Sequence, residues 1–374
     1  MPVYKDDKAK SNPWYFAVNH KENGKYKKIL RRGFKTQKDA KVAMTDLQNE
    51  LNKGTFIERS TTTYSAFMKD WLEDKKTKVK AVTLQTYKAL VNNHIIPHIG
   101  KIELQKLTPR HIQSLYNTLQ EKKALSGENI QKVHSIINDS LNKALTWGLV
   151  QKNVASVVDR PKSVKKEMEV WEIEEAHQFL KVAEKDRYYG VFLLALTTGM
   201  RQGEILGLRW KDVDLETGIL AITQTLSHDG KELQVGAKTD SGVRTVMIDD
   251  DTVKVLKNLD KRCKEEKMKA GPELYSKLGL VNCTALGTPV TPRNIMRSFY
   301  RLVDDAKVKK IRFHDLRHTH ATMLLKGNVN PKIVAERMGW TDTKMLDRYQ
   351  HVMPNMQKQA AETFGNLFFN IKAN

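Results

Sequence analysis

Two basic side chains and a tyrosine near the end of this 374-residue chain have the types and spacing needed for chemistry on a phosphate ester. His314 and Arg317, in the string HDLRHTHA, are three residues apart, so on a helix they share one face and can reach the same anion. Tyr349 follows in an RYQHV string, and a tyrosine hydroxyl can attack phosphorus to form a covalent ester. The pattern predicts a site that holds a phosphodiester beside a cation and cleaves it with Tyr349.

A second arginine motif, TGMRQGEILGLRW, lies earlier in the chain. Arg201 follows an expected buried helix at 191–197 that ends at Gly199, and free backbone N–H groups at such a junction add to the attraction for a phosphate. Glu204 lies three residues further on, and Lys238 lies in AKTDSGVR between two expected strands. Taken singly, each of these residues also fits an ordinary solvated or helix-face position.

The order of these motifs resembles the signature of the tyrosine site-specific recombinases, the phage integrase family, in which H-x-x-R is followed by Gly-His or Gly-Trp and then by tyrosine. The resemblance implies that Arg201 and Arg317 bind the scissile phosphate, while Tyr349 forms a 3′-phosphotyrosyl bond. It also implies that Lys238 protonates the leaving 5′ oxygen and that Glu204 supports the site. The implied catalytic residues are Arg201, Lys238, His314, Arg317, Trp340 and Tyr349.

The chemistry explains these residue types. Guanidinium groups remain charged and can bind phosphate oxygens bidentately, while Tyr349 needs a proton acceptor, for which His314 is the candidate. Where many relatives have a second histidine, this chain has Trp340, which can donate a hydrogen bond but cannot titrate. Because a phosphotyrosyl ester preserves the energy of the phosphodiester, religation needs neither ATP nor a metal ion. No cofactor is expected.

Two alternatives use other residues of the same region. His314, His318 and His320 have spacings that can hold zinc, but the string lacks the glutamate of HExxH or HxxEH. Tyr300, in RSFYRL, is the alternative tyrosine, and its amphipathic helix is expected either to bury it or to present it to DNA.

Composition agrees with a nucleic-acid partner. The net charge is +21 and the pI is near 9.7, which favours a polyanion such as DNA, although a generally adhesive basic protein has the same charge. The apolar run 191–196 is too short to span a bilayer, so no membrane association is expected. Two cysteines cannot form a disulfide framework, which suits a reducing cytoplasm, and the family resemblance implies that of a bacterial host.

The length predicts several domains. Residues 1–60 are expected to form a small α+β domain, which resembles the arm-binding domain of phage and transposon integrases. Residues 61–160 read as an all-α bundle, which resembles the core-binding domain, and 161–169 as a linker. Residues 170–374 are expected to form a mixed, mainly α catalytic domain with a small antiparallel sheet and a C-terminal tail.

Within residues 1–60, strands are expected at 14–18, 26–32 and 33–35, followed by a helix from Thr36 to about Asn52. This segment has a net charge of +7, one third of the total on less than one sixth of the length, which favours contact with DNA over a merely solvated hairpin. The residues predicted to enter a DNA groove are Lys27, Lys28, Arg31 and Arg32.

Beyond residue 60, the expected helices cover 64–76, 82–94, 109–121 and 127–147, with a break at 97–100. Strands are expected at 218–225, 233–237 and 243–248. Gly327 and Asn328 are expected to end one helix and Pro331 to begin the next, which runs to Met338.

The expected partner is double-stranded DNA with core and arm attachment sites. The resemblance further implies a homo-tetramer on DNA, an accessory excision factor and a host DNA-bending protein. The apolar tail at 355–372 is expected to pack either on its own chain or on a neighbouring protomer. A type IB-like topoisomerase and a non-catalytic DNA-binding relative remain the alternative functions.

Overall fold

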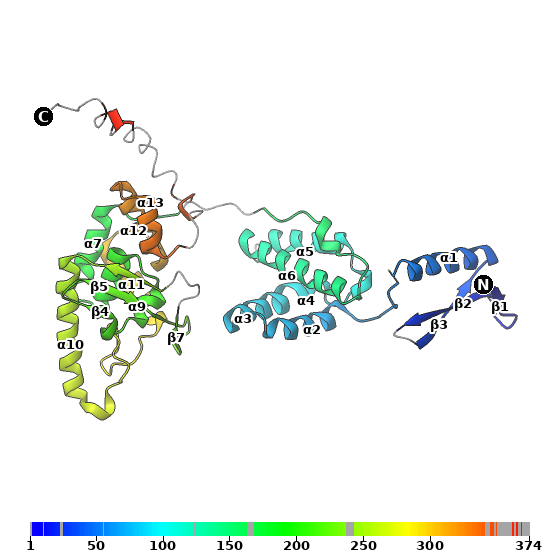
Figure 1. The fold of residues 1–374 in the computed structure, drawn as a ribbon, viewed down its shortest axis with the longest axis horizontal. Coiled ribbons are helices and arrows are strands. Elements are labelled where there is room, and N and C mark those ends of the chain that lie inside the picture. The colour runs from blue at the N-terminus through cyan, green and yellow to red at the C-terminus, as the bar shows by residue number, and fades with distance from the viewer. Residues whose placement is uncertain are drawn as a thin grey trace. The chain divides into compact units, whose positions relative to one another are not determined.

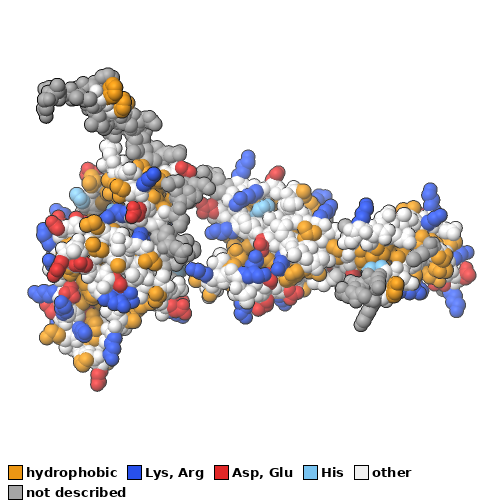
Figure 2. All heavy atoms as spheres, viewed as in Figure 1, with side chains coloured by type: hydrophobic (Ala, Val, Ile, Leu, Met, Phe, Trp, Pro, Cys, Tyr) orange, Lys and Arg blue, Asp and Glu red, His pale blue; other side chains and the backbone are white. Residues whose placement is uncertain are grey.

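The computed structural model describes residues 2–9, 11–22, 25–54, 56–122, 125–162, 168–236, 243–340, 345–347, 349, 361–362, 364–365 and 368. The chain forms two compact units, Met1–Lys166 and Glu167–Asn374 (Figure 1). On the face shown in Figure 2, Lys and Arg side chains are spread over both units with Asp and Glu among them. Among the helices in these ranges, none is long and apolar enough to cross a membrane.

The first unit begins with a three-stranded antiparallel sheet in the order β1 (Val3–Lys5), β2 (Trp14–Glu22) and β3 (Lys25–Phe34). Helix α1 (Gln37–Asn52) follows, and the Thr36 side chain accepts a hydrogen bond from the backbone of the first turn. The two longer strands and the helix are as predicted. The third strand was predicted wrongly, because residues 33–34 continue β3 and the edge strand comes from the very start of the chain.

The four basic residues of β3 do not share one face of this sheet. Side chains alternate along a strand, so Lys28 and Arg32 point to one side, and Lys27 and Arg31 to the other. Arg31 is the register partner of Phe16, which is buried with residues of α1. Lys28 and Arg32 therefore lie on the face that α1 leaves uncovered.

The rest of the first unit is helical: α2 (Tyr64–Lys76), α3 (Ala81–Leu90), a π-helical turn (Val91–Ile95), α4 (Ile96–Ile99), α5 (Pro109–Glu121) and α6 (Gly127–Thr146). The predicted break at 97–100 is wrong. Pro97 lies in the first turn of α4, where its missing N–H costs no hydrogen bond, and the chain stays helical until Gly100. Buried polar links join α2 to α6, since Tyr64 Oη lies 2.7 Å from Ser140 Oγ.

The second unit contains α7 (Ile173–Ala183), α8 (Tyr189–Thr198), α9 (Gln202–Gly207), α10 (Asp250–Leu274), α11 (Pro292–Ala306), α12 (Phe313–Lys326) and α13 (Pro331–Met338). Its core surrounds α8, which is apolar on every side and almost wholly buried. An aromatic cluster packs against α8, in which the ring centroids of Trp171, Phe179 and Phe299 lie 4.9–6.0 Å apart.

The predicted strand region forms two small antiparallel sheets. One has the order β4 (Val213–Asp214), β5 (Ile219–Ile222) and β8 (Arg244–Met247), and the other pairs β6 (Gln224–Leu226) with β7 (Leu233–Val235). The single strand predicted at 218–225 is therefore two strands in different sheets, and β4 was not predicted. Residues 237–242, between β7 and β8, lie outside the described residues.

Gly199 lets the chain turn from α8 into α9, since its φ of +64° is a conformation that L-residues rarely adopt. A Cβ added there would lie 2.6 Å from Met338 Sδ and 2.7 Å from His320 Cδ2. Both side chains are buried, so neither can move aside freely. The glycine thus lets α8 lie close to α12 and α13.

We expect Gly199→Ala to destabilise the second unit more than Gly279→Ala, a matched control with a φ of +62° and no described atom within 4 Å of the added Cβ. The control should cost about 1–2 kcal/mol for the left-handed backbone alone. Gly199→Ala should cost roughly 1–3 kcal/mol more because of overpacking. Hydrogen exchange of α8 and α12 peptides against urea measures both, and equal losses would contradict the close packing.

Candidate active site

Helix α12 carries the histidine–arginine pair predicted from the sequence. Arg312 is the N-cap of the helix, and its backbone N–H donates to Asp315 Oδ2 at 2.8 Å. His314 is exposed, whereas Arg317 has only 3% of its surface exposed. The helix ends at Lys326, and α13 begins at Pro331, as predicted.

The Arg317 guanidinium donates to the backbone carbonyls of Gly199 and Met338. These carbonyls belong to the C-terminal ends of α8 and α13, where the helix dipole concentrates negative charge. Burial and the nearby Arg201 lower the pKa of Arg317 to about 9, which still leaves it protonated at pH 7. The structure thus holds a fixed cation between two helix ends.

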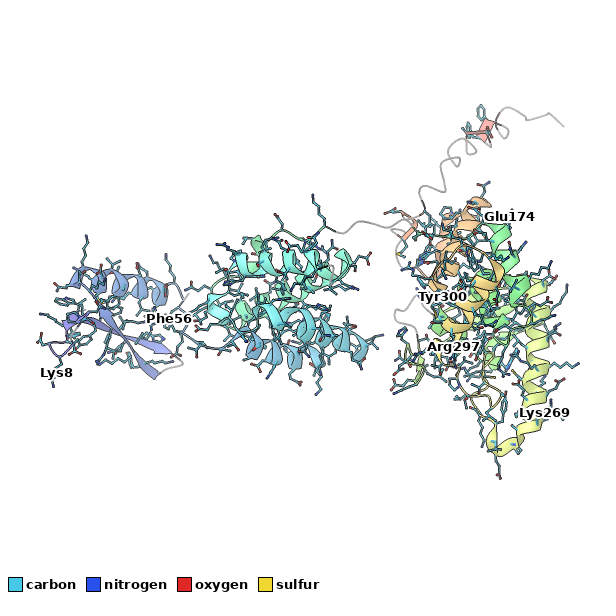
Figure 3. The ribbon with its side chains drawn as sticks, turned by 180° about the vertical axis from the view of Figure 1, so that it is seen from behind. Lys8, Phe56, Glu174, Lys269, Arg297 and Tyr300 are labelled. Carbon is cyan, nitrogen blue, oxygen red and sulfur yellow. The ribbon has the colours of Figure 1, made fainter. Side chains whose placement is uncertain are left out.

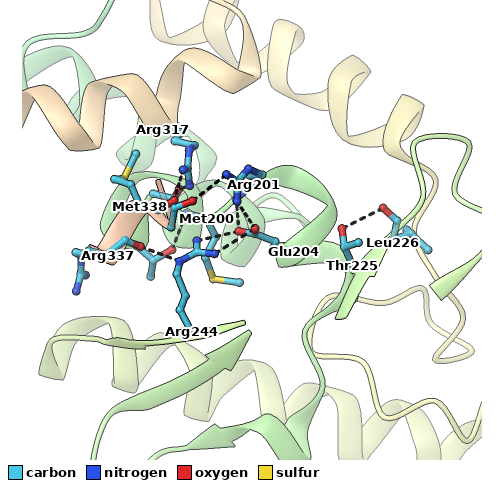
Figure 4. A network of polar contacts seen from close by, with 12 residues as sticks. Met200, Arg201, Glu204, Thr225, Leu226, Arg244, Arg317, Arg337 and Met338 are labelled. Carbon is cyan, nitrogen blue, oxygen red and sulfur yellow. Dashed lines mark hydrogen bonds and ion pairs between the residues drawn. The ribbon is translucent and has the colours of Figure 1, made fainter. Parts of the chain in front are cut away.

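Arg201 begins α9 and binds Glu204 twice, through its backbone N–H at 2.8 Å and through Nη1 at 2.7 Å (Figure 4). Glu204 also accepts from Arg244, with Nη2 at 3.0 Å and Nη1 at 3.2 Å. The Glu204 and Arg244 side chains are each 6% exposed, whereas that of Arg201 is 42% exposed. Glu204 therefore holds the backbone and the guanidinium of Arg201, while part of the side chain remains exposed to solvent.

Glu204 remains ionised in this network. Burial alone would raise the pKa of Glu204, but the hydrogen bond and charge of Arg244, together with the charge of Arg201, lower it overall. Arg244 also donates from Nε to the carbonyl of Arg337 at 2.9 Å, which links β8 to α13. The sequence reasoning missed Arg244. The alternation of side chains along a strand could have identified it. Arg244 shares a face with buried Val246, and a buried guanidinium needs an acidic partner.

Tyr349 is fully buried, and its hydroxyl lies 2.5 Å from His318 Nδ1. Its ring stacks on Trp340 with centroids 5.5 Å apart, and the Arg317 guanidinium lies 6.0 Å from the Trp340 centroid. The structure thus brings together Tyr349, Trp340 and Arg317, three of the residues named from the sequence.

The histidine in contact with Tyr349 differs from the one expected. The predicted partner was His314, but the described contact is with His318, one helical turn further along α12. The rings of the two histidines meet edge to face with centroids 5.2 Å apart. Partial desolvation and the Arg317 charge lower the pKa of His314, so this exposed ring is mainly neutral at pH 7.

His320 has a structural environment. Its Nδ1 lies 2.7 Å from the carbonyl of Leu196, and its Nε2 accepts from Arg337 Nε at 3.1 Å. Burial and the Arg337 charge lower the pKa of His320 to about 4, so it is neutral at pH 7. Both ring nitrogens of His320 are thus engaged with protein groups and not with a shared zinc position. Among the described residues, no group of three or more His, Cys, Asp or Glu side chains is placed to hold a metal ion.

Some predicted residues lie elsewhere. Lys238 is outside the described residues. Tyr300 projects from α11 (Figure 3), and its half-buried ring packs against the core of the second unit. In the tail, Phe364 and Phe368 stack on each other and remain 62% and 59% exposed.

Family models match along most of the chain. Residues 167–356 match the phage integrase family, 63–120 a phage integrase N-terminal SAM-like domain, and 2–51 an arm DNA-binding domain. A XerC-like tyrosine recombinase of Caldanaerobacter subterraneus is 28% identical, over 94% of this chain and 95% of its own length. The ICEBs1 integrase of Bacillus subtilis is 26% identical, over 94% of this chain and all of its own.

Solved structures have the same fold. The Tn1549 transposon integrase in complex with a circular intermediate DNA aligns with a TM-score of 0.67 at 18% identity, over 81% of this chain and 99% of its own. A lambda integrase tetramer bound to a Holliday junction aligns with a TM-score of 0.59 at 16% identity, over 92% of this chain and 97% of that one. The expected multidomain, mainly helical fold is confirmed.

We expect Glu204→Gln to cost about 3–5 kcal/mol of stability at pH 7, because it leaves the buried Arg244 guanidinium without its carboxylate. The folded pKa of Glu204 lies below its unfolded value of about 4.3, so its contribution is complete above that value and is lost as the pH falls through the folded pKa. The free energies of unfolding of wild type and variant should therefore differ strongly at pH 7 and converge as the pH falls through the folded pKa of Glu204.

The matched control is Asp251→Asn, which removes an exposed carboxylate paired with Lys254 and should leave stability unchanged. A Glu204→Gln loss that persisted undiminished at low pH would contradict the assignment of an ionised, buried carboxylate.

Proposed function

Because the chain belongs to the phage integrase family, whose members are tyrosine recombinases that cleave and rejoin DNA, we propose that Tyr349 is its nucleophile and that Arg201 and Arg317 bind the scissile phosphate. The protein is thus a site-specific DNA recombinase. The observation that carries the proposed residue roles is the cluster in which Arg317, Trp340 and Tyr349 pack together beside the Glu204-bound Arg201.

Phosphate binding follows from the charge of the cluster. Arg201, Arg244 and Arg317 carry three positive charges against the single negative charge of Glu204, so the site has an unbalanced positive charge that an anion stabilises. Arg201 is the partly exposed member and meets the phosphate first. A phosphate bound to Arg317 offsets the repulsion from Arg201, and its attraction to the guanidinium grows as negative charge develops on the oxygens.

The remaining steps of the proposal concern bond exchange. Tyr349 attacks phosphorus and forms a 3′-phosphotyrosyl bond, while Lys238 protonates the departing 5′ oxygen, as the family resemblance implies. Exposed His314 and the Trp340 indole N–H donate hydrogen bonds to the phosphate oxygens. Tyr349 is fully buried, so its hydroxyl must become accessible before it meets a phosphate.

We further propose that the protein integrates or excises a mobile element, as the names of its relatives suggest for those proteins. It acts as a homo-tetramer on core sites while the N-terminal sheet binds arm sites, with an accessory excision factor and a host DNA-bending protein as further partners. Its place of action is the cytoplasm of a bacterial host. The lambda integrase tetramer on a Holliday junction supports the proposed assembly.

The test of the nucleophile is a nicked suicide duplex that carries the element-end sequence. Wild-type protein should form a covalent adduct on a denaturing gel, in the presence of EDTA, whereas Tyr349→Phe should form none, because phenylalanine has no oxygen to attack phosphorus. The matched control is Tyr300→Phe, which removes another tyrosine hydroxyl of the same unit and should leave adduct formation intact.

Each other outcome selects an alternative. Adducts on unrelated DNA at the same rate favour a type IB-like topoisomerase. Binding without cleavage favours a non-catalytic DNA-binding relative. An adduct retained by Tyr349→Phe contradicts the proposed nucleophile.

The two faces of the N-terminal sheet predict different effects on arm-site binding. Lys28→Ala combined with Arg32→Ala removes two cations from the uncovered face, so affinity should fall and the slope of log K against log salt should decrease by about 1 per lost phosphate contact. Lys27→Ala is the control, because Lys27 lies on the other face and its Nζ is 2.8 Å from Glu58. Filter binding across salt concentrations measures both slopes, and equal effects would contradict the proposed face.

A further inference from the structure

The hydrogen bond between Tyr349 and His318 has no counterpart in the sequence motif, which contains His314 and Arg317 but not the histidine after the arginine. We propose that His318 is a catalytic residue that accepts the proton of Tyr349 as the hydroxyl attacks the scissile phosphate. This inference rests on the proposed function and assigns the proton acceptor of the same site.

Geometry supports the assignment. Oη of Tyr349 lies 2.5 Å from His318 Nδ1, within the range of a strong O–H···N contact, and both side chains are buried from competing water. Nδ1 accepts from the hydroxyl when the ring proton is on Nε2. His314 contacts the His318 ring edge to face, and the described hydrogen bond of the Tyr349 hydroxyl is to His318.

The acceptor and the phosphate-binding group are adjacent on α12. Neighbouring residues of a helix point in different directions, but Tyr349 links the two side chains. Its hydroxyl meets His318, and its ring stacks on Trp340, over which the Arg317 guanidinium lies. Tyr349 lies close enough to Arg317 that negative charge on its oxygen raises the pKa of the guanidinium.

The surrounding charges couple proton transfer to DNA binding. The charges that act on His314 and Arg317, the neighbours of His318, come from Arg312, Asp315 and Arg317 of α12, Arg201 and Glu204 of α9, and Arg244 of β8. A bound phosphate adds negative charge at this turn, which favours the imidazolium that forms when His318 accepts the proton.

The step balances as follows. The Tyr349 O–H bond breaks and its proton goes to the lone pair of His318 Nδ1, giving an imidazolium. The oxygen forms a bond to phosphorus as the bond from phosphorus to the 5′ oxygen breaks, and the proposed Lys238 ammonium protonates that oxygen. In religation the 5′-hydroxyl returns its proton to Lys238, and the imidazolium returns its proton to Tyr349.

Single-turnover cleavage of the suicide duplex against pH tests the proposal. The wild-type rate should fall tenfold per pH unit below the pKa of His318 in the complex and reach a plateau above it. His318→Gln should cleave about 10²–10⁴-fold more slowly, and its rate should keep rising toward the tyrosine pKa of about 10. His314→Gln, one turn away, should slow cleavage but keep the acidic limb.

Folding and alternative roles are separated by further readouts. DNA affinity of His318→Gln should match wild type, and added imidazole should restore cleavage to His318→Gly at a rate that follows the neutral imidazole fraction. Faster cleavage by His318→Gln would show that the hydrogen bond to His318 holds Tyr349 in an inactive position, and it would overturn the proposal. An unchanged acidic limb in that variant would do the same. Failure of wild type to form any adduct would instead contradict the proposed function.

Discussion

The rest of the site depends on the ion pairs that the buried Glu204 carboxylate forms with two arginines. The carboxylate accepts from Arg201 and from Arg244, and Arg244 in turn binds the carbonyl of Arg337. Without this shared negative charge, two guanidiniums would repel each other in a region of low dielectric. One side chain of α9 thus connects the start of that helix to β8 and to α13, which come from distant parts of the chain.

The same arrangement leaves the site short of negative charge. Arg317 is held by helix-end carbonyls, which carry partial charge and do not neutralise a guanidinium fully, and Arg201 keeps a solvent-exposed side. A DNA phosphate supplies the missing charge to donors that are already in place, so little reorganisation is needed at the moment of reaction. Binding of DNA and activation of Tyr349 then have a common electrostatic cause.

Local signals in the sequence were enough to predict some elements. Gly327 and Asn328 end α12 and Pro331 begins α13, because glycine, asparagine and proline determine backbone conformation locally. The family indicated by the motifs is the one whose models match the chain. Pro97 misled the prediction, because proline ends a helix only beyond its first turn and the sequence does not show where that turn lies.

Contacts between segments that are distant in the sequence could not be predicted from it. Helical spacing places His314 and His318 on one face, but it cannot show which of them meets a tyrosine more than thirty residues away. Arg244 was overlooked because its partner, Glu204, belongs to another element. The choice between the two faces of β3 likewise depends on where α1 packs, which alternation alone leaves open.

The most direct test of the account is a structure of the protein on two cleaved DNA ends with orthovanadate, which mimics the five-coordinate phosphorus of the transition state. The account predicts that Tyr349 Oη is bonded to vanadium, that the Arg201 and Arg317 guanidiniums both donate to equatorial oxygens, and that Glu204 still holds Arg201. A vanadate bound without Arg201 and Arg317, or bonded to a residue other than Tyr349, would contradict it.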